Sequence, residues 1–218
     1  MKAFVTGCSR GIGQSIFNRF KKLNIDVIAP TREQLDLSKS GAIEDYLSGI
    51  GEIDILINNA GINNLTNIEN TKYSDLLETF NINFFSPYLI TSHFLNQFKN
   101  NNYGRIVNIS SIWGSRAKEN RSVYSSSKSS IHTLTKQVVA ETKGYNILTN
   151  TVSPGFISTD LTYKNNSRDE IELIKEAIPL KKLGTVDEIS KWVVNLSTDN
   201  EYINGQEIII DGGFLCVV

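Results

Sequence analysis

The feature that most constrains the fold is an apolar run followed at once by a glycine-rich turn and then by a segment of helical periodicity. The run Ala3-Phe4-Val5 is typical of a buried strand, and the turn Thr6-Gly7-Cys8-Ser9-Arg10-Gly11-Ile12-Gly13 follows it directly. A helical period continues in Ile16, Phe17, Phe20 and Leu23. Glycines let a backbone approach a phosphate closely, and a helix N-terminus offers free N–H groups to an anion.

This order of elements predicts the pyrophosphate site of a dinucleotide. The spacing is G-x-x-x-G-x-G rather than G-x-G-x-x-G, and the alternative is a glycine turn that only packs a helix on a sheet. We expect the phosphate contacts to come from Gly7, Ser9, Arg10, Gly11, Ile12 and Gly13.

Strand-like and helix-like segments alternate along the whole chain. Apolar runs predict strands at 3–6, 25–29, 53–58, 105–109, 147–153 and 207–210. Helical periodicity occupies 12–22, 75–99, 123–143 and 186–197. Such alternation predicts the α/β class: a single doubly wound parallel sheet of the Rossmann type, with helices on both faces and one domain over 1–218. Ligands of such sheets bind beyond the carboxyl ends of the strands.

A tyrosine and a lysine four residues apart form the most informative chemical pair. In Tyr124-Ser-Ser-Ser-Lys128 the phenol and the ammonium lie on one face of a predicted helix, and Ser111 precedes the tyrosine by thirteen residues. The cation would favour the phenolate and lower the tyrosine pKa from about 10. A phenol tuned in this way exchanges protons with a substrate oxygen near neutral pH.

Together these residues resemble the short-chain dehydrogenase/reductase family, and 3-oxoacyl-carrier-protein reductases in particular. The resemblance runs over nearly the whole chain, and its motifs occur in the family's order. Besides the glycine turn and the tyrosine–lysine pair, they are Asn58-Asn59-Ala60-Gly61, Asn81-Ile82-Asn83 before Ser86-Pro87, Gly104 to Ser111, Pro154 to Thr159, and Gly205-Gln206 with Asp211-Gly212-Gly213.

The resemblance implies hydride transfer between a nicotinamide and a carbonyl or alcohol carbon. Tyr124 would exchange the proton, Ser111 would donate a hydrogen bond to the same oxygen, Lys128 would tune the tyrosine and hold the ribose, and Asn83 would hold a water. Further cofactor contacts would come from Asp36, Leu37, Asn59, Ala60, Gly61, Pro154, Gly155, Ile157 and Thr159. Asp36 also reads as a helix cap for the segment that starts near Ser40.

One departure from the family pattern concerns the second crossover. The second strand ends near Ala29, and Leu35-Asp36-Leu37-Ser38 follows after room for a turn only. We therefore expect the crossover helix after the second strand to be shortened or missing, which would leave the adenine end of the cofactor site more open.

The choice of cofactor depends on three charged residues. No acid closes the second strand, whereas Arg10 and Arg32 lie where a 2′-phosphate would sit. This favours NADPH. If Glu33 takes the strand-end position instead, NAD becomes the better match.

The favoured function is an NADPH-dependent ketone reductase of the 3-oxoacyl or keto-sugar type. The alternatives are an NAD-linked alcohol dehydrogenase, a non-catalytic dinucleotide-binding redox sensor and a structural subunit. We expect Trp113, Phe156 and Tyr163 to line the substrate side. The segment 167–178 could form a short amphipathic helix that covers the substrate, with an ordinary surface connection as the alternative.

Composition argues against several other classes. A net charge of −1 suggests no nucleic-acid or anionic-membrane surface, and no apolar stretch is long enough to span a membrane. Cys8 and Cys216 are expected to be free thiols in a reducing cytoplasm, without a signal peptide. His93 and His132 are expected to be packing or surface residues, so we predict no metal site.

Oligomerisation is expected from the resemblance, as a homodimer or homotetramer. The predicted helices 75–99 and 123–143 would supply the larger interface. The apolar tail Phe214-Leu215-Cys216 would supply a second interface, or would pack inside its own subunit.

Overall fold

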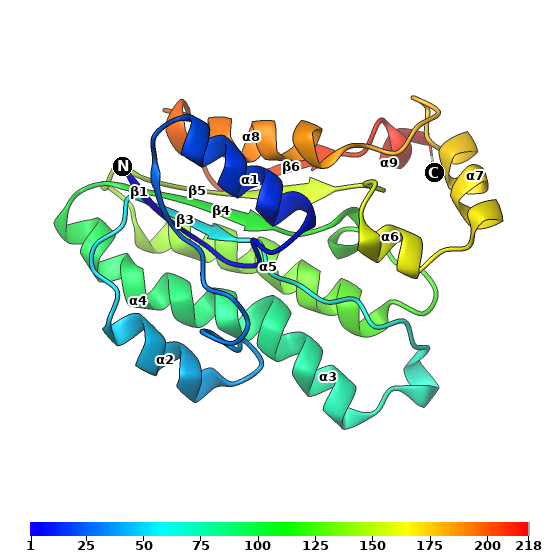
Figure 1. The fold of residues 1–218 in the computed structure, drawn as a ribbon, viewed down its shortest axis with the longest axis horizontal. Coiled ribbons are helices and arrows are strands. Elements are labelled where there is room, and N and C mark those ends of the chain that lie inside the picture. The colour runs from blue at the N-terminus through cyan, green and yellow to red at the C-terminus, as the bar shows by residue number, and fades with distance from the viewer. Residues whose placement is uncertain (218) are drawn as a thin grey trace.

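The computed structural model describes residues 1–217. Its strands are β1 (Lys2–Val5), β2 (Asp26–Ile28), β3 (Ile55–Asn58), β4 (Gly104–Ile109), β5 (Ile147–Pro154) and β6 (Glu207–Ile210). They form one sheet in the order β2-β1-β3-β4-β5-β6, and all neighbouring strands are parallel. The predicted doubly wound parallel sheet is confirmed (Figure 1).

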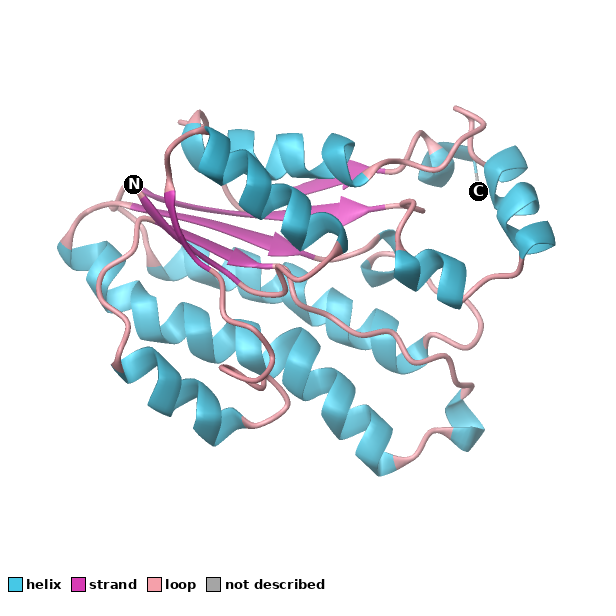
Figure 2. Ribbon diagram, in the orientation of Figure 1, coloured by secondary structure: helices cyan, strands magenta, loops and turns pink. Residues whose placement is uncertain are grey.

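Helices cover both faces of this sheet (Figure 2). One face carries α1 (Gly11–Lys22) and α8 (Val186–Thr198), and the other carries α2 (Ser40–Ser48), α4 (Ser86–Asn100) and α5 (Ser122–Glu141). Side chains alternate along the strands, so Ala3 and Val5 join the core under α1 and α8 whereas Phe4 joins the core on the opposite face. This alternation gives the molecule two cores separated by the sheet.

The predicted helix 75–99 is continuous but not regular. It consists of α3 (Tyr73–Phe80), a π-helical turn (Asn81–Phe85) and α4, which follow one another without a break. A π-turn inserts an extra residue into the helical ladder, and such turns are frequent at functional sites. Residues 63–71, which precede α3, contain a short 3₁₀ turn, Ile68–Asn70.

The second crossover is short, as the sequence indicates. A turn over residues 32–34 replaces a helix after β2, and the chain then passes Asp36 before α2 begins at Ser40. The crossover therefore still contains a helix, α2, which begins after the Asp36 segment. Strand β2 forms one edge of the sheet.

Three short helices lie beyond the carboxyl ends of the strands (Figure 1): α6 (Asp160–Lys164), α7 (Arg168–Ala177) and α9 (Phe214–Val217). The expected short helix at 167–178 is α7, which begins with a capping box between Ser167 and Glu170. Phe214 packs on Trp113 and Phe156, so this part of the apolar tail is used inside the subunit.

Candidate active site

The glycine turn joins β1 to α1 and leaves the first N–H groups of that helix without a side-chain cap. Gly7 and Gly11 have φ values of 72° and 58°, which side chains rarely tolerate. A Cβ on Gly13 would lie 2.1 Å from the carbonyl oxygen of Gly7, so only glycine fits there. The turn is therefore shaped as an anion cradle at a helix N-terminus.

Hydrogen bonds connect the ends of β1 and β3 beside this turn. The Thr6 hydroxyl accepts hydrogen bonds from the backbone N–H groups of Asn59 (3.0 Å) and Ala60 (3.1 Å). The Asn59 amide donates to the carbonyl oxygens of Thr6 (2.9 Å) and Gly7 (3.0 Å). Asn59 thus holds the glycine turn in place, a role that the sequence did not indicate.

A cleft of about 570 Å³ runs from the glycine turn to the segment after β2. Its walls include most of the cofactor contacts expected from the sequence: Gly7, Ser9, Arg10, Gly11, Ile12, Gly13, Arg32, Asp36, Leu37, Asn59, Ala60, Gly61 and Thr159. Glu33 also lines it, so both arginines and the competing acid border the same space. The volume and the glycine cradle fit a dinucleotide.

Asp36 is engaged in its own turn. Its carboxylate accepts hydrogen bonds from the Ser38 backbone (3.1 Å) and hydroxyl (2.7 Å), and these bonds hold the pKa of Asp36 below its usual value. The residue at the cap of α2 is Lys39 rather than Asp36. Asp36 and Leu37 still line the cleft.

Ser111, Tyr124 and Lys128 converge where β4 ends and α5 begins. Ser111 follows the last residues of β4 and caps the next turn, accepting from Trp113 N–H at 3.2 Å. Tyr124 lies in the first turn of α5, and Lys128 lies one turn further along the same helix. The Lys128 ammonium is 6.0 Å from the centre of the Tyr124 ring.

The electrostatics of this pair differ from the expectation. Burial raises the pKa of Tyr124, and the nearby Ser111 hydroxyl and Arg121 charge oppose that rise only in part. Lys128 is not among the groups that lower the pKa of Tyr124, and its ammonium donates to the Ile109 carbonyl oxygen at 2.8 Å. Burial lowers the pKa of Lys128 itself to about 8. The prediction that Lys128 lowers the tyrosine pKa is therefore wrong for this state of the site.

Asn83 lies in the π-turn and is almost completely buried. Its side chain exchanges two hydrogen bonds of 2.9 Å with the backbone of Ile62 and donates a third to the Ser127 hydroxyl at 3.0 Å. A Cβ on Gly61 would lie 3.3 Å from the Asn83 oxygen and 3.2 Å from the Lys128 nitrogen. Asn83, Lys128 and the backbone at Gly61 therefore meet in one place.

The segment after β5 divides between the site and the core. Gly155 lines the hollow beside Tyr124, and Thr159 lines the cofactor cleft and caps α6. The side chain of Ile157 instead belongs to the core under α1 and α8 and is 5% exposed. Ile157 can therefore contact a cofactor only through its backbone, which limits the expected contact. Pro154 is the last residue of β5.

A small hollow of about 80 Å³ adjoins the two hydroxyls of Ser111 and Tyr124. Trp113 and Phe156 line it, as expected. Tyr163 does not, and its hydroxyl is hydrogen-bonded to the Ser158 hydroxyl at 2.8 Å. Its remaining lining residues are Asn63, Arg121, Gly155, Leu161, Thr162, Asn165 and Asn166. Sequence reasoning missed Arg121, because its run of charged and polar neighbours at 116–121 resembles an ordinary solvated loop.

Behind the catalytic candidates lies a polar network centred on His132. Its ring contacts the Ser110 hydroxyl at 2.7 Å, and that hydroxyl donates to the Lys128 carbonyl oxygen at 2.9 Å. Burial lowers the pKa of His132, although Glu207 at 3.5 Å opposes this. His132 is thus a packing residue, as expected, but a hydrogen-bonded one. No cluster of three or more His, Cys, Asp or Glu side chains suited to a metal occurs within residues 1–217.

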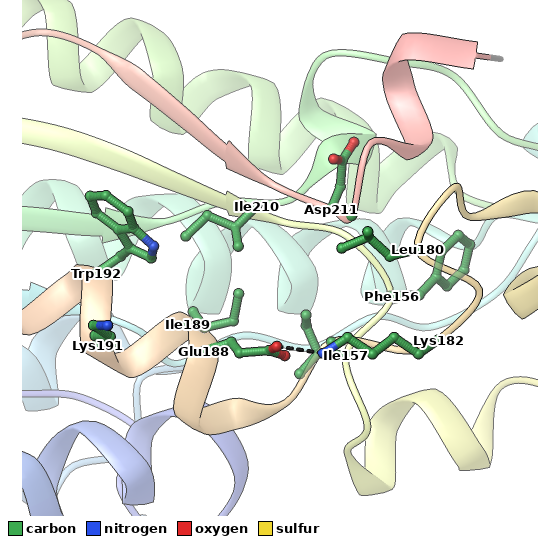
Figure 3. Close-up of a pocket in the computed structure, with 12 residues that line it drawn as sticks. Phe156, Ile157, Leu180, Lys182, Glu188, Ile189, Lys191, Trp192, Ile210 and Asp211 are labelled. Atoms are coloured by element: carbon green, nitrogen blue, oxygen red, sulfur yellow. Dashed lines mark hydrogen bonds and ion pairs between the residues drawn. The ribbon is translucent and has the colours of Figure 1, made fainter.

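A second pocket, of about 300 Å³, lies between α8 and the end of β6 (Figure 3). The ion pair between Lys182 and Glu188 (2.6 Å) borders it, together with Trp192 and Leu180. Of the residues expected in the active site, only Ile157 and the substrate-side Phe156 reach it. This pocket is therefore separate from the cleft that holds the glycine turn.

A doubly wound parallel sheet with a glycine cradle at its switch point defines a dinucleotide-binding α/β protein. The profile of a family described as Enoyl-(Acyl carrier protein) reductase matches residues 29–215. The chain belongs to the short-chain dehydrogenase/reductase family.

Individual relatives agree with this assignment over nearly their full lengths. The 3-oxoacyl-[acyl-carrier-protein] reductase of Rickettsia conorii is 31% identical, over 99% of this chain and 97% of the relative. A solved 4-hydroxyisoleucine dehydrogenase mutant, complexed with NADH and succinate, is 28% identical with a TM-score of 0.94 and covers 99% of each chain. The solved structure of ElxO with NADP bound is 28% identical with a TM-score of 0.89, covering 99% of this chain and 98% of the other.

These findings make the protein an oxidoreductase that acts on CH–OH or keto groups with a nicotinamide dinucleotide. None of the helices described over residues 1–217 is long and apolar enough to cross a membrane.

Proposed function

We propose that the protein is an NADPH-dependent ketone reductase whose reacting oxygen lies between Ser111 and Tyr124. The observation that carries the proposal is that these two side chains border the same hollow, next to a cleft of dinucleotide size. The similarity to a 3-oxoacyl reductase supports the keto direction. The proposed substrates are 3-oxoacyl or keto-sugar compounds.

In this proposal each side chain has a separate task. A bound NADPH would supply a hydride to the carbonyl carbon. Tyr124 would give its phenolic proton to the carbonyl oxygen, while Ser111 would donate a hydrogen bond to that oxygen as negative charge develops. Burial, which raises the pKa of Tyr124, keeps the phenol protonated at neutral pH and so ready to act as an acid.

Lys128 and Asn83 would restore the proton. The Lys128 ammonium is fixed by the Ile109 carbonyl (2.8 Å), and a pKa of about 8 lets it lose and regain a proton near neutral pH. Asn83 holds the Ile62 backbone beside it, leaving a polar path between Lys128 and the loop at Gly61. The same ammonium would hold the nicotinamide ribose once the cofactor is bound.

The preference for NADPH rests on the positive rim of the cleft. Arg10 and Arg32 both line it, and the Arg10 guanidinium makes an exposed, long contact of 3.8 Å with Asp160. Two weakly engaged guanidiniums suit a 2′-phosphate. Glu33 lines the same rim and supports the second candidate, an NAD-linked alcohol dehydrogenase.

Titration with NADPH and NADH, followed by fluorescence, tests the cofactor preference. We expect tighter NADPH binding, and we expect Arg32→Ala to weaken NADPH binding about tenfold or more, because it removes a charge-assisted pair, while leaving NADH binding unchanged. Arg168→Ala is the matched control, since Arg168 lies on α7 and does not line the cleft. Tighter binding of NADH would favour the dehydrogenase, and binding of neither would contradict both candidates.

Turnover tests the catalytic roles separately from cofactor binding. We expect Tyr124→Phe to lower kcat for ketone reduction by about 10²- to 10⁴-fold with the cofactor affinity retained. Unchanged kcat in this variant would contradict the proposed role of the phenol.

We also propose a homodimer or homotetramer. Phe85 and Tyr88 on the π-turn and α4 are 42% and 51% exposed, and Trp192 on α8 is 47% exposed. Large exposed apolar side chains on two separate faces are typical of association surfaces. Sedimentation analysis of the wild type and of Phe85→Asp distinguishes an assembly through α4 from a monomer.

A further inference from the structure

The hollow beside Ser111 and Tyr124 contains a buried positive charge that the protein itself does not neutralise. Arg121 is 6% exposed, and its buried Nε has no hydrogen-bond partner among the described residues. None of the side-chain ion pairs formed among residues 1–217 includes it. A guanidinium removed from water without an acceptor is costly, so an arginine in this condition marks a place where an acceptor binds.

The position of Arg121 connects it to the reacting groups. It precedes α5 directly and is three residues before Tyr124, and both line the same hollow of about 80 Å³. Its charge favours the phenolate of Tyr124, which places the guanidinium within electrostatic range of the phenol. A group bound to Arg121 would therefore lie close to the carbon that accepts the hydride.

Arg121 has a positive neighbour, and no acid among residues 1–217 lines the hollow. Arg121 lies 5.8 Å from the centre of the Trp113 ring, and the Lys118 ammonium lies 5.3 Å from the same ring. Burial and the charge of Arg121 lower the pKa of Lys118. No Asp or Glu lines the hollow, and Glu170, the acid that acts on Lys118, lies outside it. The positive charge around the hollow therefore favours the binding of an anion.

A second unpaired polar atom among residues 1–217 belongs to Asn63, which lines the same hollow. The Asn63 amide oxygen is buried without a partner, although the Asn63 carbonyl accepts a bond from Asn165 (3.4 Å). A buried acceptor of this kind suits a hydroxyl group, or a carboxylate if the amide is turned so that its nitrogen faces the hollow. Either arrangement suits a small polar ligand rather than an alkyl chain.

We propose that Arg121 binds a carboxylate on the substrate, so that the site takes small keto acids or hydroxy acids rather than neutral ketones or thioesters. The planar guanidinium pairs with a carboxylate through two parallel hydrogen bonds, which fixes orientation as well as charge. The small volume of the hollow leaves room for a carboxylate next to the reacting carbonyl. This substrate class rests on the reductase function proposed above, and it narrows the 3-oxoacyl and keto-sugar compounds to those that carry a free carboxylate.

A pair of substrates that differ only in charge tests the assignment. Acetoacetate and methyl acetoacetate are compared with the wild type and whichever nicotinamide cofactor it binds. We expect kcat/KM for the acid to exceed that for the ester, and Arg121→Gln to lower the acid value by about 10- to 150-fold, as the loss of a charged hydrogen bond predicts. We expect the ester value to fall by less than the acid value, because the ester loses only the effect of the Arg121 charge on Tyr124.

Two further variants separate binding from folding. Arg121→Lys keeps the charge but cannot form the two parallel hydrogen bonds of a guanidinium. It should retain part of the preference for the acid that Arg121→Gln loses. Lys118→Gln removes a charge from the same aromatic ring without changing the lining of the hollow, and it should leave the preference nearly intact. A wild type that reduces the ester as well as the acid would overturn the proposal, as would an equal loss on both substrates in Arg121→Gln.

A binding measurement keeps the proposal testable if neither ketone is reduced. Malonate and malonamide are titrated calorimetrically into the protein saturated with oxidised cofactor. We expect malonate to bind more tightly than malonamide in the wild type and to lose that advantage in Arg121→Gln. Malonate binding that is absent, or equal in both proteins, overturns the carboxylate site. Reduction of the ester with no preference for the acid would contradict the carboxylate site but not the proposed reductase function.

Discussion

Lys128 gives a prediction whose sign and size follow from its burial. Burial lowers the pKa of its ammonium from the ordinary 10.5 to about 8 in the folded protein without cofactor. Below pH 8 both the folded and the unfolded chain carry the proton. Between pH 8 and 10.5 the unfolded chain binds more protons than the folded one, so the free energy of unfolding must rise with pH in this window.

The magnitude follows from the size of the shift. One pKa unit corresponds to about 1.4 kcal/mol, so a shift from 10.5 to about 8 destabilises the fold by about 3 kcal/mol below pH 8. This cost disappears as the pH rises through 10.5. The Ile109 carbonyl is the only hydrogen-bond partner of the ammonium among the described residues, and it is not charged.

The assay is urea unfolding of the cofactor-free protein at a series of pH values, for the wild type and for Lys128→Met. Other groups titrate in both proteins, so the difference between the two free energies of unfolding isolates Lys128. We expect the wild type to gain about 3 kcal/mol relative to the variant between pH 8 and 10.5. Repeating the pair in a Tyr124→Phe background removes coupling to the phenol. A difference that does not change with pH would refute the burial argument.

Three other substitutions test separate contacts. Gly13→Ala would place a Cβ 2.1 Å from the Gly7 oxygen, so we expect loss of cofactor binding in a fluorescence titration and destabilisation by about 3 kcal/mol; Gly41→Ala, whose Cβ would meet open space, is the control. Asn83→Ala removes three hydrogen bonds of a buried side chain and should lower the free energy of unfolding by about 3 kcal/mol in urea. Thr185→Ala removes the capping box of α8 and should lower the melting temperature, as expected for a loss of about 1 kcal/mol; an unchanged value would contradict the role of the cap.

The sheet and most of the cleft could be predicted because they depend on local patterns. Apolar runs followed by glycine, asparagine or serine specify where a parallel strand ends, and these ends meet at one edge of the sheet. The shortened crossover after β2 could be predicted from residue counting alone, since too few residues separate Ala29 from Asp36 for a helix.

What could not be predicted depends on long-range packing. Arg121 is buried because residues 63–71 fold across it, with Thr66 N–H donating to the Asn120 carbonyl at 3.0 Å. Nothing in the local sequence signals that contact. The same is true of Ile157, whose side chain turns into the core, and of Tyr124, whose pKa is set by burial rather than by the lysine one turn away.

The turn at residues 31–34 is held by its own side chains. Thr31 N–H donates to the Gln34 side chain at 2.9 Å, and Gln34 N–H donates to the Thr31 hydroxyl at 3.4 Å. The two residues between them, Arg32 and Glu33, take no part in these bonds and contribute nothing to either core. We therefore expect mutations at these two positions to cost little in folding stability, so that the proposed cofactor preference can change here without loss of the fold.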